Sequence, residues 1–308
     1  MCNKRNKSMN RLRLALIAVI MSFALGGSHV VVAQNLDVPI TIEEQIRAIQ
    51  NDPYLTEAEK QFHINRFALF EFDGNATSLP ADIRTLVESN SNVISGRNAI
   101  LSRVLPVPHI RQQTNWWCGP STAIQTLSYW NRTVASRYVA DQRLAAYGLG
   151  IISQHHLGTS PVTNIPQGTG RFHLPDIPLI VSFVNSRIGP SVPHRYIMPS
   201  GPITNRNTLN WNIFFSINSM GIPPIIRVQD VAGWPYSTTG HFLNISGMQA
   251  RGTDYWVTHV QLTDPYVGTE WLRLRPGHSV NTSNGTFWVD FDTLFRAMTA
   301  DGRVNWAW

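Results

Sequence analysis

Cysteine is nearly absent from this 308-residue chain, which contains only two. Cys2 lies in an N-terminal segment with the pattern of a cleaved leader, so we expect the mature protein to keep Cys118 alone. A single thiol cannot form an intrachain disulfide, which excludes a disulfide-stabilised fold. Three interpretations of Cys118 remain open: a buried small apolar residue, an intermolecular disulfide, or a reactive thiol.

Long apolar runs are also lacking, apart from one near the N-terminus. Five basic residues precede an apolar stretch from Leu14 to Leu25, which predicts a secretory signal peptide over residues 1–33 with cleavage before Gln34. The stretch is shorter than the roughly 20 residues that a membrane-spanning helix needs, although an uncleaved anchor stays an alternative. We therefore expect a secreted or periplasmic protein without stable membrane insertion after cleavage.

The mature chain also lacks an excess of charge of one sign. The predicted signal peptide holds five of the 25 Lys and Arg residues and none of the 19 Asp and Glu residues, which leaves 20 bases against 19 acids. Because the mature chain is nearly neutral, the sequence argues against nucleic acid as a partner.

The mature sequence consists of an acidic part and a basic part. Residues 34–100 carry ten acids and five bases, whereas residues 101–308 carry nine acids and fifteen bases. Capping signals at Thr41 and Thr56, followed by helical periodicity, predict two helices in the acidic part, and a third short helix is expected at 83–87. This segment is either a prosegment docked on the basic part or an integral structural appendage.

The basic part changes from helical patterns to strand patterns along the chain. Apolar residues first recur at helical spacing, and short β-rich runs bounded by turn residues follow. The predicted helices are Ser121–Trp130, Ala135–Ala146 and Ile177–Arg187, and the predicted strands are 225–229, 242–248, 255–262 and 286–289. Helices followed by an antiparallel sheet predict an α+β domain.

Cys118 stands where the first of these helices is expected to begin. Gly119-Pro120 follows it, and proline fits a first helical turn because its missing N–H would have no partner there. N–H groups and the helix dipole at such an end favour negative charge, and a thiol attacks as its thiolate. Acyl transfer also needs donors for the developing oxyanion, and Gln112 or Gln113 could supply a side-chain amide.

Four segments of this sequence resemble a known family. The segments Val107–Gln113 and Trp117–Ser121 are similar to the nucleophile region of the C39-like peptidases, a branch of the papain-like superfamily. Gly240–Gly247 resembles the strand that bears the family's base, and Leu262–Tyr266 resembles the segment that bears its orienting acid. The resemblance leaves the acidic N-terminal segment outside.

The resemblance implies a papain-like fold for residues 101–308, in which helices carry the nucleophile and an antiparallel sheet carries the base. The site that it implies consists of Cys118 as nucleophile, His241 as base, Asp264 as orienting acid and Gln112 as oxyanion donor, with Gln113 as second choice. The activity that it implies is hydrolysis of peptide bonds in a peptide or protein substrate through an acyl-enzyme.

Hairpin geometry tests separately whether His241 and Asp264 can meet. If Met248 faces Tyr255 across a turn, Asp264 is a diagonal neighbour of His241 on the same face of the sheet, within reach of a hydrogen bond. That bond would fix the imidazole tautomer and leave the other ring nitrogen for the thiol. His259 is the competing partner, but five residues along one strand place it on the face opposite Asp264.

Metal and cofactor chemistry have little support in the sequence. His155 and His156 are adjacent, so their side chains diverge on a helix or a strand, and no cysteine or carboxylate stands at zinc-ligand spacing from them. We therefore expect neither metal nor cofactor. Two other functions remain open: a cysteine amidase or acyltransferase that uses the same triad, and a non-catalytic extracytoplasmic binding module.

Overall fold

The computed structural model describes residues 41–72, 74, 79–85, 100–149, 151, 177–251 and 255–308. The predicted signal peptide, its cleavage site and the His155-His156 pair lie outside these residues. Within the described ranges, no helix is both long enough and apolar enough to cross a bilayer.

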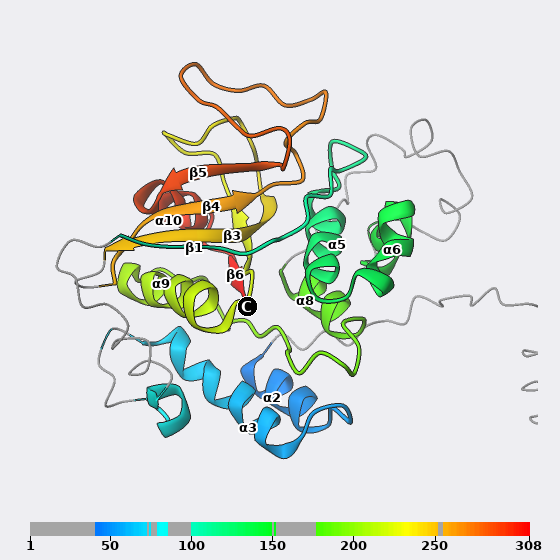
Figure 1. Ribbon diagram of the computed structural model, residues 1–308, viewed down its shortest axis with the longest axis vertical. Coiled ribbons are helices and arrows are strands. Elements are labelled where there is room, and N and C mark those ends of the chain that lie inside the picture. Colours follow the sequence, from blue (N-terminus) through cyan, green and yellow to red (C-terminus); the bar gives the residue numbers. More distant parts are fainter. Residues whose placement is uncertain are drawn as a thin grey trace, which may run out of the picture. The chain divides into compact units, whose positions relative to one another are not determined.

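One sheet of six strands forms the centre of the described structure, and the pairings between its described strands are antiparallel (Figure 1). The strands are β1 Ile100–Val104, β2 Ile225–Val228, β3 His241–Arg251, β4 Val257–Thr263, β5 Thr286–Asp290 and β6 Trp306–Ala307. β3 is the central strand, because β4 pairs along one of its edges while β2 and β1 share the other. The four predicted strands are therefore confirmed.

Helices pack on this sheet and on each other. In the basic part they are α5 Cys118–Trp130, α6 Arg132–Ala140, α7 Gln142–Gly148, α8 Ile177–Asn185, α9 Arg206–Ile213, the π-helix η4 Phe214–Met220 and α10 Phe291–Thr299. α5 packs against β3, with α6, α7 and α8 around it, and is buried from its first residue to Ser128. The prediction of an α+β domain is confirmed at this level.

The single helix predicted at Ala135–Ala146 is wrong, because Asp141 interrupts it. The backbone of Asp141 is extended, with φ −141° and ψ 98°, and its side chain accepts a hydrogen bond from the Arg143 N–H at the start of α7. An aspartate that caps a new helix in this way competes with continuation of the preceding one.

The acidic part is helical, as predicted. Its described elements are α2 Ile42–Gln50, α3 Glu57–Asn65 and the 3₁₀ helix η1 Arg66–Phe70, and residues 81–85 are also helical. Thr41 with Glu44 and Thr56 with Glu59 form complete capping boxes, each satisfying two backbone N–H groups at a helix start. Both helices therefore begin at the capping residues, Thr41 and Thr56, that the sequence predicts.

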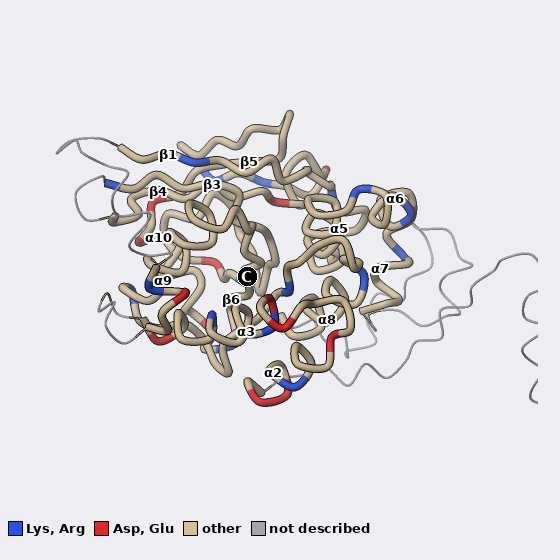
Figure 2. Tube along the Cα trace, turned by 60° about the horizontal axis from the view of Figure 1, so that its bottom comes forward, with Lys and Arg blue, Asp and Glu red and all other residues tan. Residues whose placement is uncertain are grey.

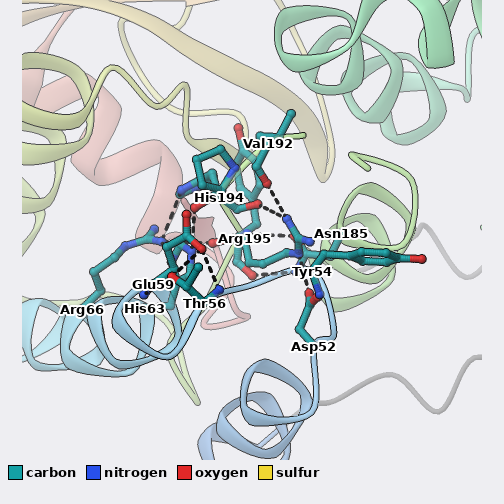
Figure 3. A network of polar contacts seen from close by, with 12 residues as sticks. Asp52, Tyr54, Thr56, Glu59, His63, Arg66, Asn185, Val192, His194 and Arg195 are labelled. Atoms are coloured by element: carbon teal, nitrogen blue, oxygen red, sulfur yellow. Dashed lines mark hydrogen bonds and ion pairs between the residues drawn. The ribbon is translucent and has the colours of Figure 1, made fainter. Parts of the chain in front are cut away.

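A polar network at the ends of α3 joins the acidic part to residues 192–195 (Figure 3). Arg66 is fully buried and donates hydrogen bonds to the Arg195 carbonyl oxygen at 3.0 Å and to His63 Nδ1 at 2.8 Å. Asp52 pairs with Arg195 at 2.7 Å. The acidic part is not of one sign throughout, because α2 carries both acidic and basic positions (Figure 2).

His63 must be neutral for this network to form. Its Nδ1 accepts from Arg66, so its Nε2 carries the hydrogen that is donated to the Pro193 carbonyl oxygen at 3.1 Å. Burial and then the charge of Arg66 lower the pKa of His63 to about 3. His194, whose ring lies edge-on to His63 with centroids 5.4 Å apart, has a pKa lowered for the same two reasons.

The free energy of unfolding should therefore fall in acid. An unfolded histidine binds its proton below a pH of about 6.5, whereas folded His63 does not until about pH 3, so stability is lost as pH drops through this window. We predict that His63→Gln, which can keep both hydrogen bonds, flattens this acid slope in urea unfolding at pH 7 and pH 4.5. The exposed control His259→Gln should leave the slope unchanged. Equal slopes in wild type and His63→Gln would contradict the assignment.

Candidate active site

Cys118 is the first residue of α5, so the predicted helix start with Gly119-Pro120 in its first turn is confirmed. Trp117, the N-cap, has no side-chain acceptor for the first N–H groups, and the first turn holds no acidic residue. The positive end of the helix dipole is thus left for another negative group, such as a thiolate. Cys118 is a free thiol with 5% of its surface exposed.

His241 and Asp264 form the predicted pair. His241 begins β3, Asp264 follows the end of β4, and His241 Nε2 lies 2.7 Å from Asp264 Oδ1. Both side chains are buried. Because Nε2 is taken by the carboxylate, Nδ1 is the ring nitrogen left for the sulfur. His259 is exposed and bonds to Thr258, so the structure places His241, and not His259, beside the acid.

The predicted register of the hairpin is wrong, although its conclusion holds. Asn244 faces Thr263 and Ile245 faces Leu262, which shifts the pairing by four residues from the expected Met248–Tyr255 register. A shift by an even number keeps the same residues on the same face, so Asp264 stays on the side of His241. A bulge between Ile245 and Gly247 changes the register by one beyond this point.

The environment of His241 favours its protonated form. Burial lowers the pKa of His241, but the charge and hydrogen bond of Asp264, followed by the interaction with Cys118, more than compensate and raise it to about 10. The imidazole therefore keeps its proton at neutral pH. A positively charged ring between a carboxylate and a sulfur is the arrangement that stabilises a thiolate nucleophile.

Asp264 accepts three hydrogen bonds in its fully buried position. Oδ1 accepts from His241 and, at 2.7 Å, from the backbone N–H of Tyr266, while Oδ2 accepts from the hydroxyl of Tyr236. The Asp264 N–H donates to the carbonyl oxygen of Gly285 at 2.9 Å. Tyr236 was missed by the sequence reasoning, because it lies in a loop outside every recognised segment.

Position 285, whose carbonyl oxygen accepts the hydrogen bond from the Asp264 N–H, requires a glycine. Its φ of +67° is left-handed, and a Cβ there would lie 2.0 Å from Cδ2 of the His109 ring. Any side chain at 285 would therefore displace either His109 or the carbonyl that receives the Asp264 N–H.

A buried amide network fixes α5 against the strands that carry His241 and Asp264. Gln125 lies two helical turns after Cys118, and its Nε2 donates to Asn244 Oδ1 at 3.1 Å and to the Thr263 carbonyl oxygen at 3.4 Å. Asn244 Nδ2 in turn donates to the Thr126 hydroxyl at 2.9 Å. Since α5, β3 and β4 are joined by these bonds, the three triad residues cannot shift independently.

Gln112 and Gln113 differ in their surroundings. Gln112 is buried, its backbone N–H donates to the Pro265 carbonyl oxygen at 2.9 Å, and its Nε2 donates to the Thr114 carbonyl oxygen at 2.8 Å. Gln113 is exposed. Gln112 is therefore tied to the residue that follows Asp264, while its role as oxyanion donor stays a prediction.

No cluster of three or more His, Cys, Asp or Glu side chains in the described part of the chain could hold a metal ion. A scan against protein-family models, a search of the curated proteins and a search of the solved structures each found no match to this chain. The resemblance to the C39-like peptidases therefore stays a prediction from the sequence motifs.

The amide network makes a prediction about stability. Asn244→Ala should lower the free energy of unfolding by about 2 kcal/mol, because Gln125 and Thr126 lose buried partners. The control Gln61→Ala removes an exposed side-chain hydrogen bond to Asn65 and should change it by less than about 0.5 kcal/mol. Urea unfolding measures both, and equal losses would show that the network does not hold α5 in place.

Proposed function

We propose that this chain is an extracytoplasmic cysteine peptidase of papain-like fold, similar to the C39-like peptidases. The observation that supports the proposal most is the buried bond between Asp264 and His241, whose ring interacts with the free thiol of Cys118. Cys118 stands more than a hundred residues before His241 and Asp264 in the sequence, and its interaction with His241 supports its assignment to the same site. Structural histidines rarely need both a buried carboxylate and a thiol.

In the proposed reaction, the Cys118 thiolate attacks the carbonyl carbon of a peptide bond. The tetrahedral oxyanion is stabilised by the Cys118 N–H at the start of α5 and by the amide of Gln112. The His241 imidazolium gives its proton to the leaving amine, and the C–N bond breaks to leave a thioester on Cys118. Water then attacks the thioester while His241 accepts its proton, and the C–S bond breaks to release the acid product and restore the Cys118 thiolate beside the His241 imidazolium.

The first alternative, an amidase or acyltransferase, uses the same groups and differs in the substrate. The second alternative, a binding module, gives no reason for a charged pair at the site. Burying a carboxylate and an imidazole costs several kcal/mol per ion before their attraction offsets it. A protein that only binds its partner would gain nothing from placing this pair at a free thiol, so catalysis is favoured.

The catalytic assignment predicts which substitutions abolish turnover. Incubated with a peptide mixture, the wild-type protein should generate new N-termini, and Cys118→Ala should generate none. His241→Ala should lose at least about 1000-fold in rate, as expected for triad members that act as a unit. His259→Ala, which alters an exposed histidine on the neighbouring strand, is the matched control and should retain full activity.

Mass spectrometry of the products distinguishes the outcomes. Cleavage by Cys118→Ala at the wild-type rate would overturn the proposal. If peptides stay intact while peptidoglycan fragments or thioesters are consumed in a Cys118-dependent manner, the amidase or acyltransferase alternative is correct. If nothing is consumed, the binding module is correct.

We further propose that residues 41–85 stay with the catalytic part as a structural appendage. Leu69 and Ile83 belong to the main hydrophobic core, and the Asn212 side chain donates to the Leu69 carbonyl oxygen at 2.7 Å. The docking contacts shown in Figure 3 involve residues 185–195 and none of the triad residues. The described part of this segment therefore contributes to the main core, which supports its role as a structural appendage.

The intact mass of the secreted protein tests this proposal. We expect a mature species that begins at Gln34 and is fully active. Isolation of a species that lacks residues 34–100 and is more active than the longer one would instead establish the prosegment alternative.

A further inference from the structure

Tyr236 lies beside both Asp264 and His241. The side chain is 1% exposed, and its hydroxyl donates to Asp264 Oδ2, the carboxylate oxygen that His241 does not use. The Tyr236 ring also stands edge-on to the His241 ring, with centroids 6.0 Å apart, and lies 5.5 Å from the Tyr266 ring. Nothing in the resemblance assigns a role to this tyrosine.

We propose that Tyr236 is a positioning residue of the triad, which fixes the plane of the Asp264 carboxylate and tunes its strength as an acceptor for His241. This inference rests on the proposed function, because it concerns the same site. Tyr236 does not contact the reacting bond, so it acts through Asp264.

The hydrogen-bond count supports a fixed carboxylate plane. Oδ1 receives two donors, His241 Nε2 and the Tyr266 N–H, each at 2.7 Å. Without a donor on Oδ2, the carboxylate could turn about its Cβ–Cγ bond and exchange its two oxygens. With Tyr236 present, each oxygen has its own partner, and the rotation breaks all of these hydrogen bonds at once.

The chemistry of the donor supports a tuning role. Burial, followed by the neighbouring charge of Asp264, raises the pKa of Tyr236, so the phenol stays protonated and acts as a donor throughout the working pH range. A hydrogen bond from a neutral donor stabilises the carboxylate without a competing positive charge. A stronger donor makes Asp264 a weaker partner for the imidazolium, and a missing donor makes it a stronger one. Three other titratable side chains of the described chain also interact with His241 or Asp264, namely Cys118, Tyr266 and His109.

The test varies the donor strength of position 236 in the full mature chain. Three proteins are compared: wild type, Tyr236→Phe, and a protein with 3-fluorotyrosine, a more acidic phenol, at position 236. NMR of ¹⁵N-labelled histidine gives the pH midpoint at which His241 loses its proton. We expect the midpoint to be lowest with fluorotyrosine, intermediate in wild type and highest in Tyr236→Phe.

Peptide hydrolysis by the same proteins gives the second readout. Tyr236→Phe should lower kcat roughly 10- to 100-fold, the range for loss of one hydrogen bond to a charged group, with KM unchanged. Tyr129→Phe is the matched control, since it removes a tyrosine hydroxyl that donates to the Gly221 carbonyl oxygen, and should alter neither the midpoint nor kcat.

The outcomes separate this inference from the proposed function. If the His241 midpoint is the same in all three proteins and kcat is unaffected by Tyr236→Phe, the positioning role is wrong while the peptidase assignment stands. If no protein hydrolyses peptides but the midpoints follow the expected order, the proposed function fails and the coupling of Tyr236 to the pair stands.

Discussion

The buried bond between Asp264 and His241 is the interaction on which the rest of the site depends. A carboxylate with no exposed surface is costly to bury unless it is paired and fully hydrogen-bonded. Three donors meet this requirement, one of them the imidazole itself. Because the carboxylate holds the proton on His241, the ring that interacts with Cys118 is a cation at neutral pH.

The surrounding fold fixes the positions of Asp264, His241 and Cys118 relative to one another. β3 carries His241 and β4 leads to Asp264, so the pairing of the two strands decides whether these two side chains share a face. Gln125 and Asn244 then join α5, which begins with Cys118, to both strands through buried hydrogen bonds. A polar network inside a core is costly when it is incomplete, which makes it a device for selecting one arrangement of helix and sheet.

The sequence was informative where local chemistry decides the structure. The start of α5 followed from Gly119-Pro120, and the starts of α2 and α3 from the two capping boxes. The pairing of His241 with Asp264 was anticipated although the assumed hairpin register was wrong by four residues, because an even error does not change the face of a strand. An odd error would have placed the two side chains on opposite faces.

What the sequence did not reveal depends on distant contacts. Tyr236 comes from a loop whose conformation is set by packing on Asp264 and Phe287, for which no local pattern exists. α10 was missed because β5 runs directly into it, with Asp290 as both the last strand residue and the helix cap. The buried Arg66 network was hidden too, since nothing local indicates that this arginine bonds to the Arg195 carbonyl oxygen, 129 residues away.

The pH dependence of Cys118 alkylation by iodoacetamide tests the central claim most directly. A free thiol reacts about ten times faster per pH unit up to about pH 8.5, because only its thiolate attacks. If a protonated His241 stabilises the thiolate, the rate in the wild-type protein should be high and nearly constant between about pH 6 and 8, and His241→Gln should restore the steep rise. A steep rise in the wild-type protein itself would contradict the account.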